Sequence, residues 1–300
     1  MYLFNDKKKL NHRYRSKLIK ELEKNNISIS SVGVFDSYSE LIKTIFIIFI
    51  TNKKYISSNM KCNILCMMFF WKSGTVIVNG LGRHKKSSIF RTALKCLFLL
   101  NKEKEIIFQN YTDYRFFRLH NRNSSIFWVP GSGGSKRATG KSEDITIISR
   151  DEKIDYSTQS ILTIRELEKT KKIHIIGCSK EKIEKIFNDK NIVGCGYVNQ
   201  DDIFNKSRVF FQPSGYGEGV PHTLVDALCS NMEVIISKRD FISFGLHRLN
   251  FDYKKINREI ITIEPFSNKS AHLENKKINI EYCSIILRKE RREYTPSLSS

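Results

Sequence analysis

The sequence lacks the features that mark several classes of protein. Its seven cysteines are scattered and odd in number, with no CxxC pair, which argues against a disulfide framework and a zinc site and favours reduced thiols in a cytoplasm. The longest apolar runs, residues 44–50 and 64–71, are far shorter than the ~20 residues that a membrane-spanning helix needs. Charge follows directly after Phe4, so no signal peptide is expected.

Acidic residues are scarce in the first half of the chain. Residues 1–130 contain 23 Lys and Arg against 8 Asp and Glu, and residues 51–100 contain no acid. A basic half suits nucleic acid, an anionic membrane surface or an anionic substrate. A Lys-rich composition of the source organism would explain the formal net charge of +20, but it explains the asymmetry between the two halves less well. A nucleic-acid-binding protein is the weaker alternative, because no helix-turn-helix, RNP aromatic or zinc pattern is present.

Gly140-Lys141-Ser142 invites a phosphate-loop interpretation that its context does not support. The required upstream glycine is displaced, since Gly134 lies one residue too early. The residues that follow, 144–148, predict a strand where a phosphate loop needs a helix. We therefore expect no phosphate loop here.

The chain divides into two series of alternating strands and helices. In the first, we expect strands at 2–4, 105–109 and 125–129, helices at 11–23, 37–49 and 88–100, a β-branched stretch at 27–35, and buried strand or helix pieces at 64–70 and 75–78. In the second, we expect strands at 145–149, 172–176, 192–193, 208–212 and 233–236, and helices at 158–169, 180–187, 201–206 and 221–230. Residues 260–263 and 278–286 read as further strands.

This rhythm predicts the α/β class, with parallel sheets covered by helices on both faces. We expect two Rossmann-like domains facing a central cleft, at residues 1–129 and 144–250, joined by a polar linker at 130–143. Residues 251–300 either complete the second domain or return to the first.

The most informative segment is FFQPSGYGEGVPHTLVDALCSNMEVIIS, residues 210–237. A buried strand ends at Gln212, and a Gly-rich loop containing Glu218 follows. Pro221 then lies in the first turn of a helix that Asn231 can end in a left-handed conformation. Ligands of open parallel sheets bind beyond the carboxyl ends of the strands, and free helix amides attract a diphosphate. A nucleotide is therefore expected at this loop.

The same segment resembles the donor-binding signature of the retaining glycosyltransferases of family four, the GT-B enzymes of bacterial O-antigen, capsule and exopolysaccharide assembly. Pro213-Ser214, Glu218-Gly219-Val220-Pro221 and Asp226 match its pattern. Asp226 stands where the family usually has Glu. Further resemblances, in chain order, are Asn5-Asp6 with His12-Arg13, Asn79-Gly80-Leu81-Gly82, residues 107–110 with Asp113, the inter-domain signature Val129-Pro130-Gly131-Ser132-Gly133, and Arg150 with Lys153 at a shortened interval.

The resemblance implies transfer of a sugar from a nucleotide diphosphate donor, a UDP-sugar, to a lipid-linked or growing polysaccharide acceptor in cell-surface glycan assembly. Arg150 and Lys153 would stabilise the leaving diphosphate, Glu218 would hold the donor sugar's hydroxyls, and Asp226 would accept from the ribose diol. Gly131, Ser132, Gly133, Pro213, Ser214, Gly219 and Val220 would complete the donor site. No metal or other cofactor is expected, because cationic side chains and helix amides can supply the stabilisation.

The resemblance also indicates an acceptor side in the first domain. Its candidate residues are His12, Arg13, Lys61, Asn63, Gly80 and Gly82. The histidine that often precedes the Lys-x-Asn element of relatives is absent. The basic first domain fits a lipid diphosphate acceptor at an anionic inner leaflet, with the protein peripheral to that membrane. Asp226, the short Arg150 to Lys153 interval and the C-terminal tail leave open a GT-B protein that binds sugar nucleotides without turnover.

Overall fold

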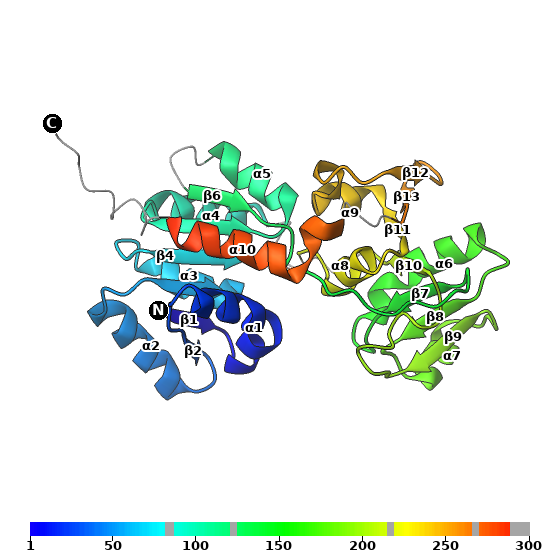
Figure 1. Ribbon diagram of the computed structural model, residues 1–300, viewed down its shortest axis with the longest axis horizontal. Helices are drawn as coiled ribbons and strands as arrows, with labels where there is room; N and C mark the ends of the chain where they lie inside the picture. The colour runs from blue at the N-terminus through cyan, green and yellow to red at the C-terminus, as the bar shows by residue number, and fades with distance from the viewer. Residues whose placement is uncertain (82–86, 121–124, 215–218, 266–269, 289–300) are drawn as a thin grey trace. The chain divides into compact units, whose positions relative to one another are not determined.

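The computed structural model describes residues 1–81, 87–120, 125–214, 219–265 and 270–288. The chain forms two compact units (Figure 1). Unit 1 contains residues 1–132 and takes the chain back from Asn275, and unit 2 is the continuous segment Gly133–Glu274. Residues 251–274 therefore complete the second unit, whereas the last described helix returns to the first.

Unit 1 is built on a sheet of six parallel strands in the order β2-β1-β3-β4-β5-β6. The strands are β1 (Tyr2–Asn5), β2 (Ser30–Gly33), β3 (Tyr55–Ser58), β4 (Gly74–Val78), β5 (Lys104–Phe108) and β6 (Ser125–Trp128). The helices are α1 (Lys8–Lys24), α2 (Tyr38–Ile50), α3 (Met60–Met68), α4 (Ser88–Leu100), α5 (Tyr111–His120) and α10 (Asn275–Ile286).

The helices of unit 1 bury three sets of apolar side chains against this sheet. One set joins Leu18 and Leu22 of α1 to Ile278 and Tyr282 of α10. The other two lie beneath α2 and α3 and beneath α3, α4 and α5. Both faces of the sheet are thus covered, as near-continuous apolar strands of a parallel sheet require.

One expectation for unit 1 is wrong, one open alternative is decided by the structure, and two elements were not foreseen. The prediction of a strand at 278–286 is wrong, because Ile278, Tyr282 and Ile286 recur every four residues and pack as one helical stripe near α1. Residues 64–70, left open between strand and helix, lie largely in α3. The sequence analysis also missed β3 and α5, whose short patterns are weak.

Unit 2 contains a sheet of seven strands in the order β12-β13-β11-β10-β7-β8-β9. The strands are β7 (Ile145–Ile148), β8 (Ile173–Ile176), β9 (Ile192–Gly196), β10 (Val209–Gln212), β11 (Glu233–Ser237), β12 (Tyr253–Lys255) and β13 (Ile260–Ile263). The helices are α6 (Thr158–Leu167), α7 (Lys180–Ile186), α8 (His222–Cys229) and α9 (Lys238–Ser243). Strands β7 to β11 pair in parallel, and β13 is antiparallel to β11 and β12. The predicted helix at 201–206 is wrong, since these residues form turns.

The stretch that ends in Gly140-Lys141-Ser142 packs along unit 2 as extended chain. The Gly140 amide donates to the Phe204 carbonyl at 2.9 Å, and a Cβ at Gly140 would lie 2.5 Å from the Asn205 carbonyl oxygen. This glycine is therefore needed for a close backbone approach. Strand β7 begins at Ile145, so the expectation that no phosphate loop occurs here is confirmed.

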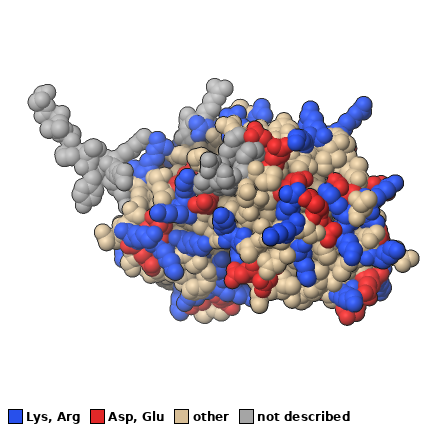
Figure 2. All heavy atoms as spheres, turned by 45° about the vertical axis from the view of Figure 1, so that its right-hand side comes forward, with Lys and Arg blue, Asp and Glu red and all other residues tan. Residues whose placement is uncertain are grey.

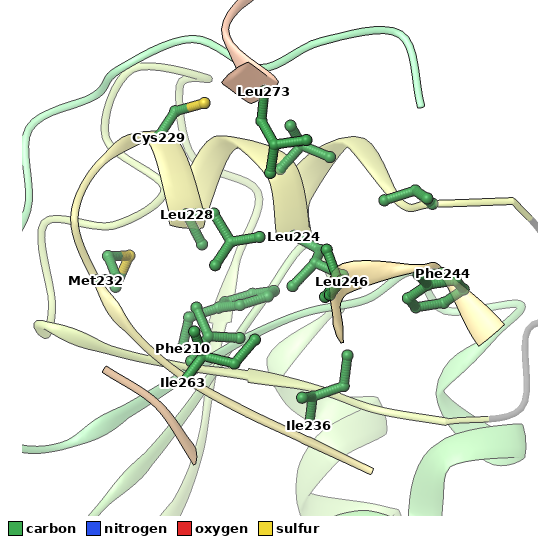
Figure 3. Packing of buried hydrophobic residues seen from close by; sticks show 14 of the residues in the cluster. Phe210, Leu224, Leu228, Cys229, Met232, Ile236, Phe244, Leu246, Ile263 and Leu273 are labelled. Carbon is green, nitrogen blue, oxygen red and sulfur yellow. The ribbon is translucent and has the colours of Figure 1, made fainter. Parts of the chain in front are cut away.

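Helix α8 is the centre of the main core of unit 2 (Figure 3). Leu224 and Leu228 point from α8 toward Phe210 of β10 and Ile263 of β13, and Leu273 covers the opposite side of the helix. Asn231 follows α8 with φ of 60°, so the predicted left-handed helix end is confirmed. The buried position of α8 fixes the direction of its amino terminus.

Three observations concern the composition of the chain. All seven cysteines are free thiols. In the described part of the chain, no helix combines the length and apolar character needed to cross a bilayer. On the face seen in Figure 2, Lys and Arg side chains are spread widely, with Asp and Glu among them.

We expect Leu224→Ala to destabilise unit 2 by about 2–5 kcal/mol, because it leaves a cavity in a fully buried site. Thermal unfolding would show a lowered midpoint. Leu162→Ala on α6 is the matched control, since Leu162 is 39% exposed and its truncation should change the midpoint little. Equal shifts for both variants would contradict the packing described for α8.

Candidate functional site

The candidate site of unit 2 lies where the strand order reverses. Strand β7 pairs in parallel with β8 on one side and with β10 on the other. The chain continues from β7 to β8 and only later returns to β10, so the loops after β7 and β10 leave the same sheet edge in opposite directions. Such a switch point forms the ligand-binding crevice of open α/β sheets. The predicted donor residues Arg150, Lys153, Pro213, Ser214, Gly219 and Val220 belong to these two loops.

The loop after β7 forms a tight turn in which the cations Arg150 and Lys153 flank Asp151 and Glu152. The amides of Lys153 and Ile154 both donate to the Arg150 carbonyl, at 2.9 and 3.0 Å. The Arg150 side chain is exposed and, among the described residues, makes no ion pair, whereas Lys153 is partly buried. The shortened interval between the two cations therefore corresponds to a single turn that keeps them together.

The loop after β10 leads into the amino terminus of α8. Gly219 and Val220 are buried, and Pro221 takes φ of −64° and ψ of 138° immediately before the helix. The first amides of a helix have no carbonyl partner within it, so they can bind an anion. Glu218, together with residues 215–217, lies outside the described residues. The predicted role of Glu218 stays a prediction.

Pro213 and Ser214 occupy the start of the same loop. Pro213 is buried, and the Ser214 hydroxyl donates to Asp240 Oδ2 at 2.5 Å. Ser237 Oγ accepts from the Asp240 amide at 3.0 Å and caps α9. The sequence analysis missed Asp240, although a Ser followed three residues later by an acid is a helix-start signal.

Asp226, the predicted ribose acceptor, is only 7% exposed. Its Oδ1 accepts from the Ser135 amide at 2.8 Å, and its Oδ2 accepts from Arg137 Nε at 3.0 Å. Arg137 Nη1 also donates to Asp201 Oδ1 at 2.8 Å. Asp226 therefore ties the extended chain after Gly133 to α8, and its carboxylate keeps further lone pairs for a ligand. Arg137 was missed because nothing near it in sequence reveals a partner 89 residues away.

Unit 1 contains a buried polar network at the carboxyl edge of its sheet. Asn59 donates to Asn5 Oδ1 at 2.6 Å, and Asn79 donates to Asn59 Oδ1 at 2.7 Å. Arg15 Nη2 in turn donates to Asn79 Oδ1 at 2.6 Å and to Ser58 Oγ at 3.1 Å. Asn5 and Ser58 end β1 and β3, and Asn59 and Asn79 follow β3 and β4, three strands that are neighbours in the sheet. The network thus fixes the loops at the reversal of strand order between β1 and β3.

The same network holds two of the predicted inter-domain residues. Arg15 Nη1 and Gln109 Nε2 donate to Ser132 Oγ at 3.2 and 2.9 Å. The Tyr282 hydroxyl of α10 donates to the Gly131 carbonyl at 2.8 Å. Burial lowers the pKa of Arg15 and raises the pKa of Tyr282. No described carboxylate contacts Arg15, so hydroxyl and amide oxygens solvate this cation.

Glycine is required at two positions of this junction. Gly131 has φ of 75° and Gly133 has φ of 82°, in the left-handed region that side chains disfavour. Of the predicted donor residues, Gly131 and Ser132 belong to unit 1, and Gly133 is the first residue of unit 2. Their residue types are explained by backbone conformation whether or not a ligand contacts them.

The predicted acceptor residues occupy different environments. His12 and Arg13 are exposed and lie within α1, and Lys61 is exposed in the first turn of α3. Asn63 has no exposed surface, and its side-chain Nδ2 donates to the Ile77 carbonyl at 2.8 Å, which attaches α3 to β4. Gly80 is partly exposed after β4, and Gly82 lies outside the described residues.

Asp6 is a further ionisable group on the same side of unit 1. Its Oδ1 accepts from the Cys62 amide at 3.1 Å. Burial raises the pKa of Asp6, while the Cys62 amide and the nearby Lys61 act in the opposite direction. Within the residues that the structure describes, no three His, Cys, Asp or Glu side chains gather into a metal-binding group.

Comparison with known proteins bears on the fold. Neither a protein-family model nor a curated protein matches the chain. Solved structures are similar to it. HepE from Anabaena in complex with UDP has a TM-score of 0.56 and 12% identity, over 83% of this chain and 82% of HepE. UDP-GlcNAc 2-epimerase from Methanocaldococcus jannaschii has a TM-score of 0.50 and 14% identity, over 96% of this chain and 100% of the epimerase.

TarM from S. aureus, in complex with Fondaparinux, alpha-GlcNAc-glycerol and UDP, has a TM-score of 0.51 and 16% identity, over 83% of this chain and 54% of TarM. The chain thus spans about half the length of TarM. At these identities the similarity shows the fold and leaves activity open. Together with the two α/β units described above, it shows that this chain has the GT-B fold.

Proposed function

We propose that this protein is a retaining glycosyltransferase that moves a sugar from a nucleotide diphosphate donor, a UDP-sugar, to a lipid-linked or growing polysaccharide acceptor. The observation that carries the proposal is the parallel pairing of β7 with β10. This pairing brings the turn that carries Arg150 and Lys153 and the loop before α8 to one edge of the sheet. A diphosphate needs both cations and free amides, and this edge offers both.

The chemistry assigned to these groups follows the charge that develops. The bond between the anomeric carbon and the diphosphate oxygen breaks, and the acceptor hydroxyl oxygen bonds to the same face of that carbon. The hydroxyl proton passes to the departing phosphate oxygen. Arg150, Lys153 and the α8 amides stabilise the negative charge on the leaving diphosphate. Glu218 holds the hydroxyls of the donor sugar, with the backbone of Gly219 and Val220 beside it.

The choice of a uridine donor has separate support. The HepE and TarM structures were solved with UDP, and the similar epimerase is named for UDP-GlcNAc. This chain has the same fold and an acid, Asp226, on the helix that follows the Gly-rich loop. We assign Asp226 to the ribose diol through the lone pairs that Ser135 and Arg137 leave available.

The acceptor is assigned to unit 1. Its exposed cations Arg13 and Lys61 suit an anionic group such as a lipid diphosphate, and the exposed His12 lies next to Arg13. The excess of cations in residues 1–130 also suits an anionic inner leaflet, near which each Lys or Arg contributes about 1 kcal/mol of attraction. We therefore propose that the protein works at the periphery of that membrane, in cell-surface glycan assembly, without a metal or other cofactor.

We expect Arg150→Ala to lower kcat/KM for sugar transfer by about a hundredfold, because one stabilising contact to the leaving group is lost. Turnover of a panel of UDP-sugars would measure it. Arg208→Ala is the matched control, because Arg208 precedes β10 at the opposite edge and forms only a surface ion pair with Glu143. An Arg150 variant as active as the control would remove the turn from the mechanism.

Glu218→Ala should abolish most sugar transfer while leaving UDP binding nearly unchanged, because the proposal gives Glu218 contacts to the sugar alone. Thermal shift with UDP and with each UDP-sugar separates the two effects, since a ligand at 100 times its Kd stabilises by about 2.7 kcal/mol. Full transfer activity in this variant contradicts the assignment. UDP binding without turnover in the natural chain would instead indicate an impaired GT-B protein.

Asp226→Asn should reduce the preference for UDP over 2′-deoxy-UDP. A hydrogen bond to a charged group contributes about 1.5–3 kcal/mol, so we expect at least tenfold discrimination in the natural chain and little in the variant. Calorimetric titration of both ligands would measure it. Arg137→Ala keeps the carboxylate, so it should lower the unfolding midpoint but retain the discrimination. If the Asp226→Asn variant also retains the discrimination between UDP and 2′-deoxy-UDP, Asp226 contributes only to the stability of the fold.

A further inference from the structure

A group of large apolar side chains in unit 1 faces solvent. We call this group the apolar edge; its members are Phe46, Phe49, Ile50, Met68, Phe70, Trp71, Leu99 and Leu100. Ile50 is 72% exposed, Phe49 63%, Met68 62% and Trp71 52%. They come from the last turns of α2 and α4 and from the turn after α3. Exposed apolar patches of this kind usually mark interaction sites.

Hydrogen bonds show that these three chain segments adjoin one another. Lys72 Nζ donates to the Thr51 carbonyl at 3.0 Å, which joins the turn after α3 to the end of α2. Asn101 Nδ2 donates to the Met67 carbonyl at 2.9 Å, which joins the end of α4 to the end of α3. Lys104 Nζ donates to the Phe69 and Lys72 carbonyls, both at 2.8 Å. The apolar edge is therefore one surface along the amino ends of β3, β4 and β5.

The fold of unit 1 does not require these side chains for its core. Helix α2 already buries Thr44 and Ile48 toward the sheet, so Phe46, Phe49 and Ile50 lie on its other sides. Phe70 and Trp71 contact each other edge to face, with ring centroids 5.1 Å apart, and both stay about half exposed. A solvent-facing Phe-Trp pair costs solubility and contributes little to folding.

The turns that carry the apolar edge have an excess of basic residues. Residues 51–54, 69–73 and 101–103 contain four lysines, Lys53, Lys54, Lys72 and Lys102, and one acid, Glu103. Lys53, Lys102 and Glu103 are exposed. Aromatic and aliphatic side chains flanked by lysines are the composition of surfaces that insert into the headgroup region of a bilayer.

We propose that the apolar edge inserts into the surface of an anionic lipid bilayer, with the lysines of these turns on the lipid headgroups. This inference goes beyond the proposed function: the apolar edge lies at the amino ends of β3, β4 and β5, whereas the acceptor candidates Lys61 and Gly80 follow the carboxyl ends of β3 and β4, so membrane attachment is assigned to the opposite end of the sheet. A second copy of the chain is the less favoured occupant. Two copies of a surface with this excess of lysine would repel each other in a symmetric interface.

Trp71 provides a direct test, because the chain contains two tryptophans and Trp128→Phe leaves Trp71 alone. We expect vesicles of phosphatidylcholine with phosphatidylglycerol to shift Trp71 emission to the blue, and brominated lipid to quench it. Phe49→Ser combined with Phe70→Ser should lower the partition coefficient in flotation by about tenfold or more, since two apolar anchors are lost. Vesicles of phosphatidylcholine alone should bind less protein.

The matched control is Ile89→Ser combined with Ile280→Ser, two side chains of unit 1 that are 82% and 45% exposed and lie outside the apolar edge. It should float like the natural chain. The proposal is overturned if Trp71 emission does not respond to anionic vesicles, or if both double variants float equally. Dimerisation that only Phe49→Ser with Phe70→Ser abolishes, without vesicle binding, would assign the surface to a second copy. Thermal shift with UDP tests donor binding separately.

Discussion

The candidate site depends on the parallel pairing of β7 with β10. Strands β7 to β11 of unit 2 run in one direction, so their carboxyl ends share an edge, and the reversal between these two strands keeps the emerging loops apart. Helix α8 is held over β10 by Leu224 and Leu228, which gives its amino terminus a fixed direction. The core packing and the anion-binding capacity of this loop are consequences of the same arrangement.

Local patterns predicted the parts of the fold that have local causes. Residues 260–263 and 88–100 were expected with the bounds that β13 and α4 have, because a β-branched run and an amphipathic repeat are each contained in a short window. Residues 278–286 were misread, because an Ile-rich segment fits a buried strand as well as a helix. Only the packing of α10 near α1 and the sheet distinguishes the two.

The site was predictable to the extent that a motif carries it. The Gly-rich loop, Pro221 and the turn at Arg150 were expected beside each other, and their strands are neighbours. Contacts between residues distant in sequence were not foreseen. Arg15 contacts Ser132 across 117 positions and Arg137 contacts Asp226 across 89, and neither distance leaves a pattern in composition or spacing. The burial of Asn63 was equally invisible, since an Asn on a helix is usually exposed.

The return of the chain to unit 1 has a consequence for how the protein can be divided. Gly134 and Glu274 form a parallel bridge, and the Gly134 amide donates to the Leu273 carbonyl at 2.9 Å. The chain segment that enters unit 2 and the segment that leaves it therefore lie side by side. Unit 2 is therefore an insertion within unit 1. It can be excised as one uninterrupted piece, whereas an amino-terminal fragment that stops at residue 132 would expose the apolar surface that Ile278, Tyr282 and Ile286 cover.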